Sequence, residues 1–167
     1  MSLSLSQLRI LSAAQGYCEL EMYVDASQEL EKIDSELRDH PQILSVRLQI
    51  YAGTQAWDLM QAVARRLVVS DPKQIQWIVS WAYATRRAES VLVAKRILLE
   101  AVNRFPGEAI LHYNLGCYEA QLGDPSAAMQ RLAQCFELDA GYRKLALEDE
   151  DLSSIWKQIR AETDDDV

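Results

Sequence analysis

The sequence predicts an all-α fold built from about four helix-turn-helix repeats and a C-terminal capping helix. Three observations support this expectation. A spacing of 34 residues recurs along the chain, the positions in that register carry small or apolar residues, and helix start and stop signals stand at the ends of the segments. A period of this length is typical of repeat proteins, in which each unit buries its apolar face by stacking on its neighbours.

Three series of positions keep the 34-residue register, and a fourth marks the ends of the units. They are Ala26, Met60, Ala94 and Ala128; Ala14, Leu48, Ala82 and Gly116; Ile33, Leu67, Ala101 and Cys135; and Pro72, Pro106 and Ala140. Small residues are needed where two helices cross closely, because a larger side chain costs about 1 to 3 kcal/mol. We therefore expect Ala94 and Ala128 to be buried, and substitution of the neighbouring Lys95 by alanine to have little effect.

The last repeat shows its two helices most clearly. A first helix is expected from about Glu108 to Leu122, and Gly123 then ends it in the left-handed conformation that glycine adopts without strain. Asp124 can cap the next helix, and Pro125 suits its first position because the missing N–H would be unpaired there anyway.

This segment resembles the consensus of the tetratricopeptide repeat family. The matching residues are Asn114, Leu115, Gly116, Gly123, Asp124, Ala128, Glu137, Leu138 and Asp139, whereas Ala140 replaces the usual proline. The resemblance implies a right-handed solenoid in a single domain over residues 1–167, with repeats at about 7–40, 41–74, 75–108 and 109–142. It also implies that the first helix of each repeat lines a concave surface.

Two repeats depart from the pattern. The first ends at Pro41, three residues later than the 34-residue frame predicts, so its second helix is expected to be one turn longer. In the second repeat, Arg47 and Leu48 replace the usual leucine and small residue.

Residues after the last repeat predict a capping helix at about 149–160. Leu152, Ile155, Trp156 and Ile159 are apolar at helical spacing, and Asp149 can serve as the N-cap. A terminal unit of a solenoid needs a cover with a polar outer face.

Composition and net charge indicate the cellular location and limit the class of partner. The net charge of −8 and the isoelectric point near 4.8 argue against nucleic acid, because phosphate binding depends on lysine and arginine. No apolar run is long enough to span a membrane, and the N-terminus lacks a basic region ahead of its short apolar stretch. The three cysteines Cys18, Cys117 and Cys135 form no paired motif, which is typical of a reducing compartment. These features predict a cytoplasmic protein with buried, unreactive thiols.

No catalytic or metal-binding constellation is visible. His40 and His112 have no nucleophile paired to them by motif, and the acidic residues from Glu148 to Asp151 lack the spacing of a calcium loop. We expect no enzymatic activity, no cofactor and no metal. Trp77 and Trp81 lie one helical turn apart, which fits either a ligand platform or, as we favour, packing against the neighbouring repeat.

Function is expected in the concave groove that the family resemblance implies. The groove residues so assigned are Gln49, Gln76, Val79, Tyr83, Arg86, Arg87, Tyr113, Cys117 and Gln121. Tyrosine and arginine are enriched at the energetic centres of interfaces. Arg86 and Arg87 could equally serve only to complement the C-terminal end of their helix dipole.

The sequence therefore predicts a protein-interaction scaffold that binds a peptide or helix of a partner protein, as a monomer or weak dimer. Two alternatives stay open. One is a small acidic chaperone for a secreted or aggregation-prone substrate. The other is a structural subunit that joins a complex through its convex face or through the apolar N-terminal Leu3, Leu5 and Leu8.

Overall fold

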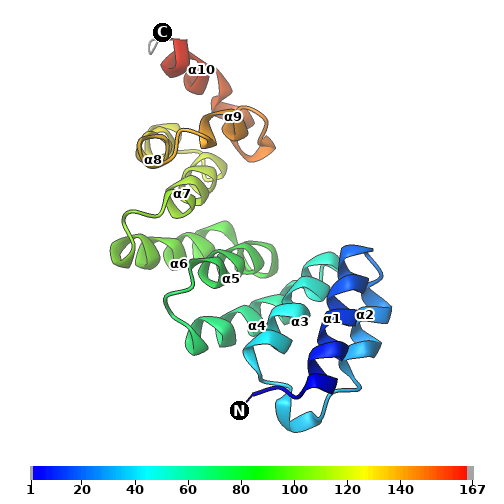
Figure 1. The fold of residues 1–167 in the computed structure, drawn as a ribbon. Helices are drawn as coiled ribbons and strands as arrows, with labels where there is room; N and C mark the ends of the chain where they lie inside the picture. The colour runs from blue at the N-terminus through cyan, green and yellow to red at the C-terminus, as the bar shows by residue number, and fades with distance from the viewer. Residues whose placement is uncertain (1, 165–167) are drawn as a thin grey trace. The chain divides into compact units, whose positions relative to one another are not determined.

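The computed structural model describes residues 2–164, and every regular element in that range is helical (Figure 1). Eight helices come first, two in each predicted repeat, and a C-terminal segment of shorter helices follows them. In the order of the predicted repeats, the helix pairs are α1 (Leu5–Glu19) and α2 (Tyr23–Leu30), α3 (Pro41–Gly53) and α4 (Trp57–Ser70), α5 (Ile75–Ala88) and α6 (Val91–Arg104), and α7 (Ala109–Gln121) and α8 (Pro125–Leu138). The C-terminal segment holds α9 (Tyr142–Ala146), the 3-10 helix η2 (Glu150–Ile155) and α10 (Trp156–Asp164).

The chain forms two compact units, residues 1–88 and residues 89–167. Unit 1 holds α1 to α5, and unit 2 holds α6 to α10. The boundary falls between α5 and α6, which are the two helices of the third predicted repeat. The single domain that the sequence predicts over residues 1–167 stays a prediction.

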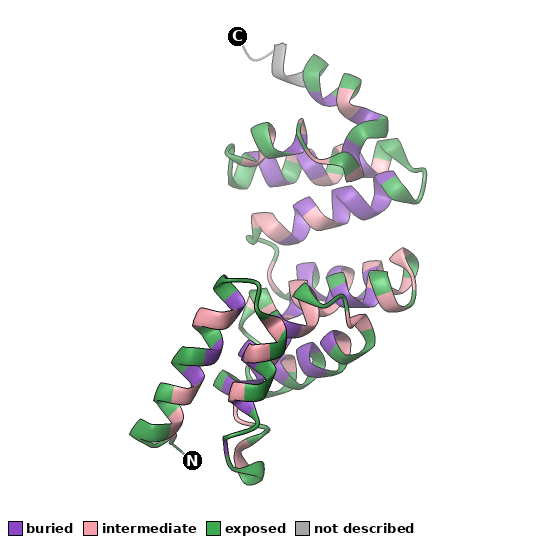
Figure 2. Ribbon diagram, turned by 90° about the vertical axis from the view of Figure 1, so that its right-hand side faces the viewer, coloured by how far each residue is buried: buried purple, intermediate pink, exposed green. Residues whose placement is uncertain are grey.

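The 34-residue register identifies the buried positions of both units. All members of the three core series are buried, and Ala14, Ala26, Ala82, Ala94 and Ala128 are fully so. In most helices the buried residues form a stripe with exposed residues on the opposite face, whereas α7 is buried on nearly all sides from Leu111 to Ala120 (Figure 2). The repeat spacing therefore predicts the core correctly, because positions 34 residues apart occupy equivalent places in successive helix pairs.

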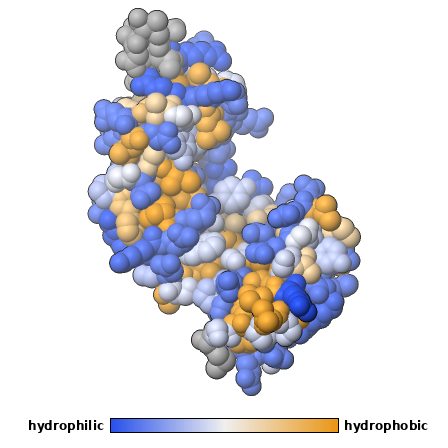
Figure 3. Space-filling model, viewed as in Figure 1, coloured by the Kyte–Doolittle hydropathy of each residue, from blue (hydrophilic) through white to orange (hydrophobic). Residues whose placement is uncertain are grey.

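Unit 1 has two apolar clusters. The first joins α1, α2 and α3 through residues such as Leu11, Leu30 and Ile43, and the second joins α3, α4 and α5 through residues such as Leu48 and Leu67. On the face of the molecule shown in Figure 3, apolar side chains also gather near the N-terminal end of the chain. Leu5 and Leu8 of α1 are exposed.

The expectation of a longer second helix in the first repeat is wrong. Helix α2 ends at Leu30 after 8 residues, and the chain then continues through the 3-10 helix η1 (Ser35–Leu37). At the end of α2 the backbone hydrogen bonds connect residues three apart, and the N–H of Ile33 donates to the carbonyl of Leu30. These turns end the helix and still bury the Ile33 side chain in the first cluster.

In unit 2, helices α7 and α8 pack closely together at Gly116. A Cβ atom at this position would lie 2.9 Å from Cγ of Leu132 and 3.4 Å from the carbonyl oxygen of Ala128. The helix ends that the sequence predicts here are confirmed. Gly123 has φ +81°, and the Asp124 carboxylate accepts a 2.9 Å hydrogen bond from the N–H of Ala127.

The capping segment is present but is not one helix. Leu152, Ile155 and Ile159 are buried as predicted, and Asp149 caps the segment by accepting from the N–H of Asp151 at 3.0 Å. The first part is the 3-10 helix η2, and only from Trp156 does the backbone become α-helical. The Trp156 indole N–H donates to the carbonyl of Ala146 at 3.0 Å, which ties the start of α10 to the end of α9.

Candidate functional site

Six of the nine predicted groove residues lie in unit 1 and three lie in unit 2. In unit 1, the side chains of Gln49, Gln76, Tyr83 and Arg87 are exposed, and Val79 and Arg86 are half-buried. In unit 2, Tyr113 and Cys117 are buried and Gln121 is exposed. The two groups are in different surroundings.

An aromatic and arginine cluster forms where the start of α4 lies beside the end of α5. The rings of Trp57 and Tyr83 meet edge to face, with 5.7 Å between their centroids and 80° between their planes. The guanidinium carbon of Arg87 lies 4.9 Å from the centroid of Trp57, and that of Arg86 lies 5.6 Å from the centroid of Tyr83. We call these four residues the aromatic–arginine surface.

Local sequence explains how these side chains come together. Tyr83, Arg86 and Arg87 are spaced by three and four residues, so they share one face of α5. Trp57 is the first residue of α4, and the preceding turn is closed by Gln55 in a left-handed conformation at φ 56°. The hydrogen bond between Gln61 and Thr85, at 3.0 Å, fixes the two helices beside the surface.

The arrangement supports both interpretations of the arginines. Both lie in the last turn of α5, where a positive charge complements the helix dipole. They also hold the two aromatic rings in place, because a cation over a ring face is attracted by about 0.5 to 1 kcal/mol at an exposed site. Tyr83 is 38% exposed, so a large amphipathic side chain faces solvent with its orientation already restricted.

Trp57 is the member that the sequence interpretation placed only as the opening residue of a helix. The signal that could have found it is the antiparallel order of neighbouring helices, which brings the first residue of one beside the last turn of the next. Trp77 and Trp81, favoured as core residues, are half-buried against the second cluster of unit 1. Arg65 lies over the Trp81 ring at 5.9 Å.

The C-terminal segment contacts all three predicted groove residues of unit 2. The Tyr113 hydroxyl donates to Asp149 at 2.7 Å, the Cys117 thiol contacts the same carboxylate oxygen at 3.8 Å, and the Gln121 amide donates to Asp151 at 2.5 Å. The three residues repeat every four positions along α7, and η2 lies across that face. Tyr113 and Cys117 are only 6% and 3% exposed, so neither presents an open surface.

Burial also sets the protonation of this region. Burial, and then the hydrogen bond to Asp149, raise the pKa of Tyr113 far above its usual value, so the phenol stays a neutral donor. Burial raises the pKa of the Cys135 thiol to about 12, and the nearby Asp139 adds to the effect. The pKa of Cys18 is raised by burial as well. These thiols are protonated at neutral pH, which makes them poor nucleophiles.

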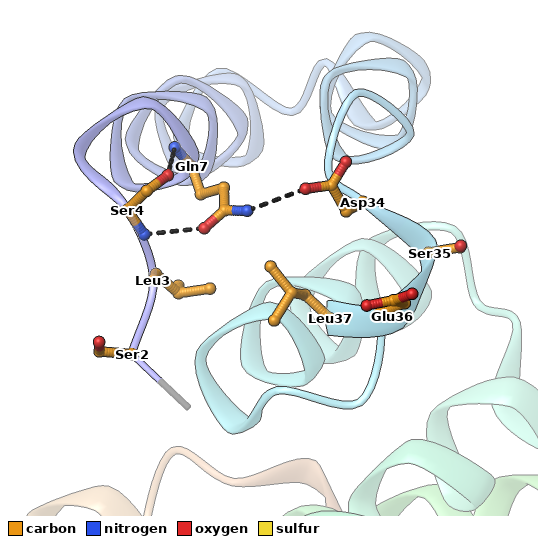
Figure 4. Close-up of a pocket in the computed structure, with 8 residues that line it drawn as sticks. All are labelled: Ser2, Leu3, Ser4, Gln7, Asp34, Ser35, Glu36 and Leu37. Carbon is orange, nitrogen blue, oxygen red and sulfur yellow. Dashed lines mark hydrogen bonds between the residues drawn. The ribbon is translucent and has the colours of Figure 1, made fainter.

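A cavity of about 640 Å³ lies at the N-terminal end of unit 1, between residues 2–7 and residues 34–37. Figure 4 shows the side chains of Leu3 and Leu37 facing one another across it. Its polar groups bond among themselves: Ser4 and Gln7 form a capping box, and the Gln7 amide donates to Asp34 at 3.2 Å. The capping box is explained by the start of α1, where Ser4 is the N-cap residue.

Neither histidine is arranged as a catalytic base. The His40 ring accepts from the N–H of Gln42 at 3.3 Å, and Nε2 of His112 lies 2.9 Å from the carbonyl oxygen of Pro106. Within the described residues, no group of histidine, cysteine and acidic side chains is placed to hold a metal ion. The same part of the chain contains no helix that is long and apolar enough to cross a membrane.

Comparison with solved structures finds helical proteins named MamA. MamA residues 41 to the end from Desulfovibrio magneticus RS-1 superposes with a TM-score of 0.71 at 16% identity, covering 81% of this chain and 76% of that one. MamA of AMB-1 gives 0.64 at 16% identity, covering 95% and 86%, and MamA of MSR-1 gives 0.67 at 17%, covering 79% and 76%. No family model and no curated protein sequence matches the chain. The chain therefore has an all-α helical-repeat fold similar to that of MamA.

Proposed function

We propose that this chain is a tetratricopeptide-repeat scaffold that binds an extended or helical segment of a partner protein on the aromatic–arginine surface. The observation that carries the proposal is the arrangement of Trp57, Tyr83, Arg86 and Arg87. Two aromatic rings and two guanidinium groups lie together and partly exposed, already oriented by one another. Preorganised aromatic and arginine side chains lose little conformational freedom on binding, which is a property of interface hot spots.

The chemistry of these groups favours binding over catalysis. Arginine forks bind carboxylates or backbone carbonyls, and the tyrosine ring provides contact area and a hydroxyl. A segment with an acidic residue beside an apolar one would complement both. Gln49, Gln76 and Val79 complete the proposed contact area in unit 1. The C-terminal segment contacts Tyr113, Cys117 and Gln121, so these three residues are not part of that area. The buried, protonated thiols of Cys18 and Cys135 and the net charge of −8 fit a cytoplasmic location and a protein partner.

Affinity capture with the native host extract, followed by mass spectrometry, identifies the partner. The captured partner is then titrated against Tyr83→Ala/Arg87→Ala, which should lose about thirtyfold or more in affinity, since removing a central anchor costs about 2 kcal/mol. Arg96→Ala, an exposed change in unit 2, is the control. A partner that binds the double variant as tightly as the unaltered protein would place recognition elsewhere. Tyr113 is left intact because its hydroxyl holds the C-terminal segment.

A further inference from the structure

A second recessed surface lies in unit 1, on the part of α4 that carries Leu59, Ala62 and Arg66. Two cavities of about 530 and 300 Å³ adjoin here. Both are lined by Asp39, Leu44, Ala62 and Arg66. We call the two together the arginine pocket. Neither cavity is lined by a residue of the aromatic–arginine surface.

The pocket follows from the early end of α2. The second helices of the later pairs, α4, α6 and α8, have 14 residues each, whereas α2 has 8. The chain between α2 and α3 therefore passes as a turn, and its residues Arg38 and Asp39 form one wall. Helices α3 and α4 form the other walls, so the recess is a feature of the backbone and not only of side-chain positions.

The pocket has an apolar floor and an apolar rim. Leu44 and Val63 are buried beneath it, at 3% and 8% exposure. Leu59 and Val69 stand at its edges and are 52% and 83% exposed. Covering such aliphatic side chains is favourable by roughly 25 cal/mol for each Å² removed from water.

Four arginines surround this apolar area in a chain whose net charge is −8. They are Arg38, Arg47, Arg65 and Arg66. Glu31 is shared between Arg38 at 3.2 Å and Arg47 at 3.4 Å, and Asp39 pairs with Arg66. Two carboxylates therefore face four guanidinium groups, and the local excess is positive.

These internal ion pairs can be exchanged for a partner's carboxylates. The side chains of Glu31, Arg38, Asp39 and Arg66 are each more than half exposed, and ion pairs of this kind contribute little to stability. Nε of Arg47 is buried and has no hydrogen-bond partner among the described residues, so this guanidinium is not fully satisfied by Glu31.

We propose that the arginine pocket binds an acidic segment of a partner protein that inserts an aliphatic side chain between its carboxylates. The guanidinium forks match carboxylates in a fixed geometry, and the floor around Leu44 accepts the aliphatic group. A nucleic acid fits less well, because its evenly charged backbone would leave the apolar floor uncovered and would meet an acidic protein. This interaction is independent of the surface around Trp57.

The test uses fluorescent synthetic peptides and fluorescence anisotropy on the full chain. The probe is acetyl-SEELEELEES-amide, and its two matched controls replace every glutamate by glutamine or every leucine by alanine. We expect the probe to bind with a dissociation constant below about 1 mM and both controls to bind at least about fivefold more weakly. Raising the ionic strength from about 0.05 to 0.5 M should weaken the probe, because salt screens exposed charges.

Two variants connect the binding to the pocket. Arg38→Glu/Arg66→Glu reverses two half-exposed charges and should lower the affinity for the probe by about tenfold or more. Arg96→Glu in unit 2 should leave this affinity unchanged. Val69→Ser should weaken the leucine peptide more than the alanine peptide. Circular dichroism of each variant confirms that it folds.

Three outcomes overturn the proposal: no binding of the probe at about 1 mM, equal loss in the Arg96→Glu control, or equal binding of the glutamine peptide. A fluorescent oligothymidylate that binds through Arg38 and Arg66 more tightly than the peptide would also overturn it, in favour of a phosphate ligand. The Tyr83→Ala/Arg87→Ala variant should bind the probe normally. Failure of the function proposed at the aromatic–arginine surface is therefore distinguishable from failure of this proposal.

Discussion

The hydroxyl of Tyr113 donates a 2.7 Å hydrogen bond to the carboxylate of Asp149, 36 residues later in the chain. This bond joins α7 to η2, and the ring of Tyr113 also packs on Tyr142 with 4.9 Å between the centroids. The C-terminal segment is thus held by polar contacts as well as by its buried Leu152, Ile155 and Ile159.

Removing this hydroxyl should destabilise unit 2. Tyr113→Phe leaves the ring in place but takes the donor from Asp149, and hydrogen bonds to charged groups contribute about 1.5 to 3 kcal/mol. Urea unfolding measures the loss. Tyr83→Phe, at a side chain 38% exposed, is the control and should change stability by less than about 0.5 kcal/mol. Equal effects of the two changes would contradict the structural role of the bond.

Removing the whole C-terminal segment should have a larger effect. Truncation after Gly141 uncovers the α7 face at Tyr113 and Cys117 and the surfaces against which Leu152, Ile155 and Ile159 pack. Exposed apolar surface at the end of a repeat array promotes association. We expect a lower thermal midpoint and self-association in size-exclusion chromatography. A truncated chain with the original midpoint and elution volume would show that the segment is not a cap.

Stability should fall at alkaline pH. Burial raises the pKa of Cys135 to about 12 in the folded state from its ordinary value of 9.0, so the unfolded chain loses this proton first. The stabilisation that the protonated thiol contributes is therefore complete below pH 9, and the folded protein loses it as the pH rises toward 12. The slope is at most about 1.4 kcal/mol for each pH unit and proton. Neutral Tyr113 adds a contribution of the same sign above its ordinary pKa.

Urea unfolding at a series of pH values from neutral to alkaline measures this slope. Cys135→Ala should make it shallower, because the variant has no thiol to ionise. If the slope is the same in both proteins, Cys135 does not contribute to the alkaline loss.

The close approach of α7 and α8 should make Gly116 intolerant of a side chain. A Cβ atom there lies 2.9 Å from Cγ of Leu132, which is itself fully buried. Gly116→Ala should cost about 1 to 3 kcal/mol in the free energy of unfolding. Gly16→Ala in α1, where a Cβ atom meets nothing within 4 Å, should stabilise by up to about 1 kcal/mol through helix propensity. Thermal unfolding of both variants should therefore show shifts of opposite sign.

The structure gives Lys95 a buried partner, so we now expect Lys95→Ala to lower stability rather than to have little effect. Nζ of Lys95 lies 2.7 Å from a carboxylate oxygen of Glu119, whose side chain is only 8% exposed. Alanine at this position leaves a buried carboxylate without a cation, which should cost about 1 to 3 kcal/mol. The double variant Lys95→Ala/Glu119→Gln should recover part of the loss. A strictly additive double-mutant cycle would show that the pair is not coupled.

The sequence by itself determined the all-α repeat fold and the positions of its core. Residues 34 apart, such as Ala94 and Ala128, are buried alike because a repeated pattern of side-chain sizes gives them corresponding places in the helices. Local signals also predicted the turn at Gly123 and Asp124, because a positive φ and a side-chain cap depend only on adjacent residues. The apolar spacing in the capping segment predicted its buried face for the same reason.

Tertiary structure alone decided which side chains are exposed and which lie together. The sequence could not show that η2 crosses the face of α7 and buries Tyr113, since the two segments are far apart in the chain and meet only in the folded structure. It could not show that Trp57 meets Arg87, or that α2 ends early and leaves room for the arginine pocket. Helix propensity and period are local properties, whereas exposure and partner choice depend on which helices pack together.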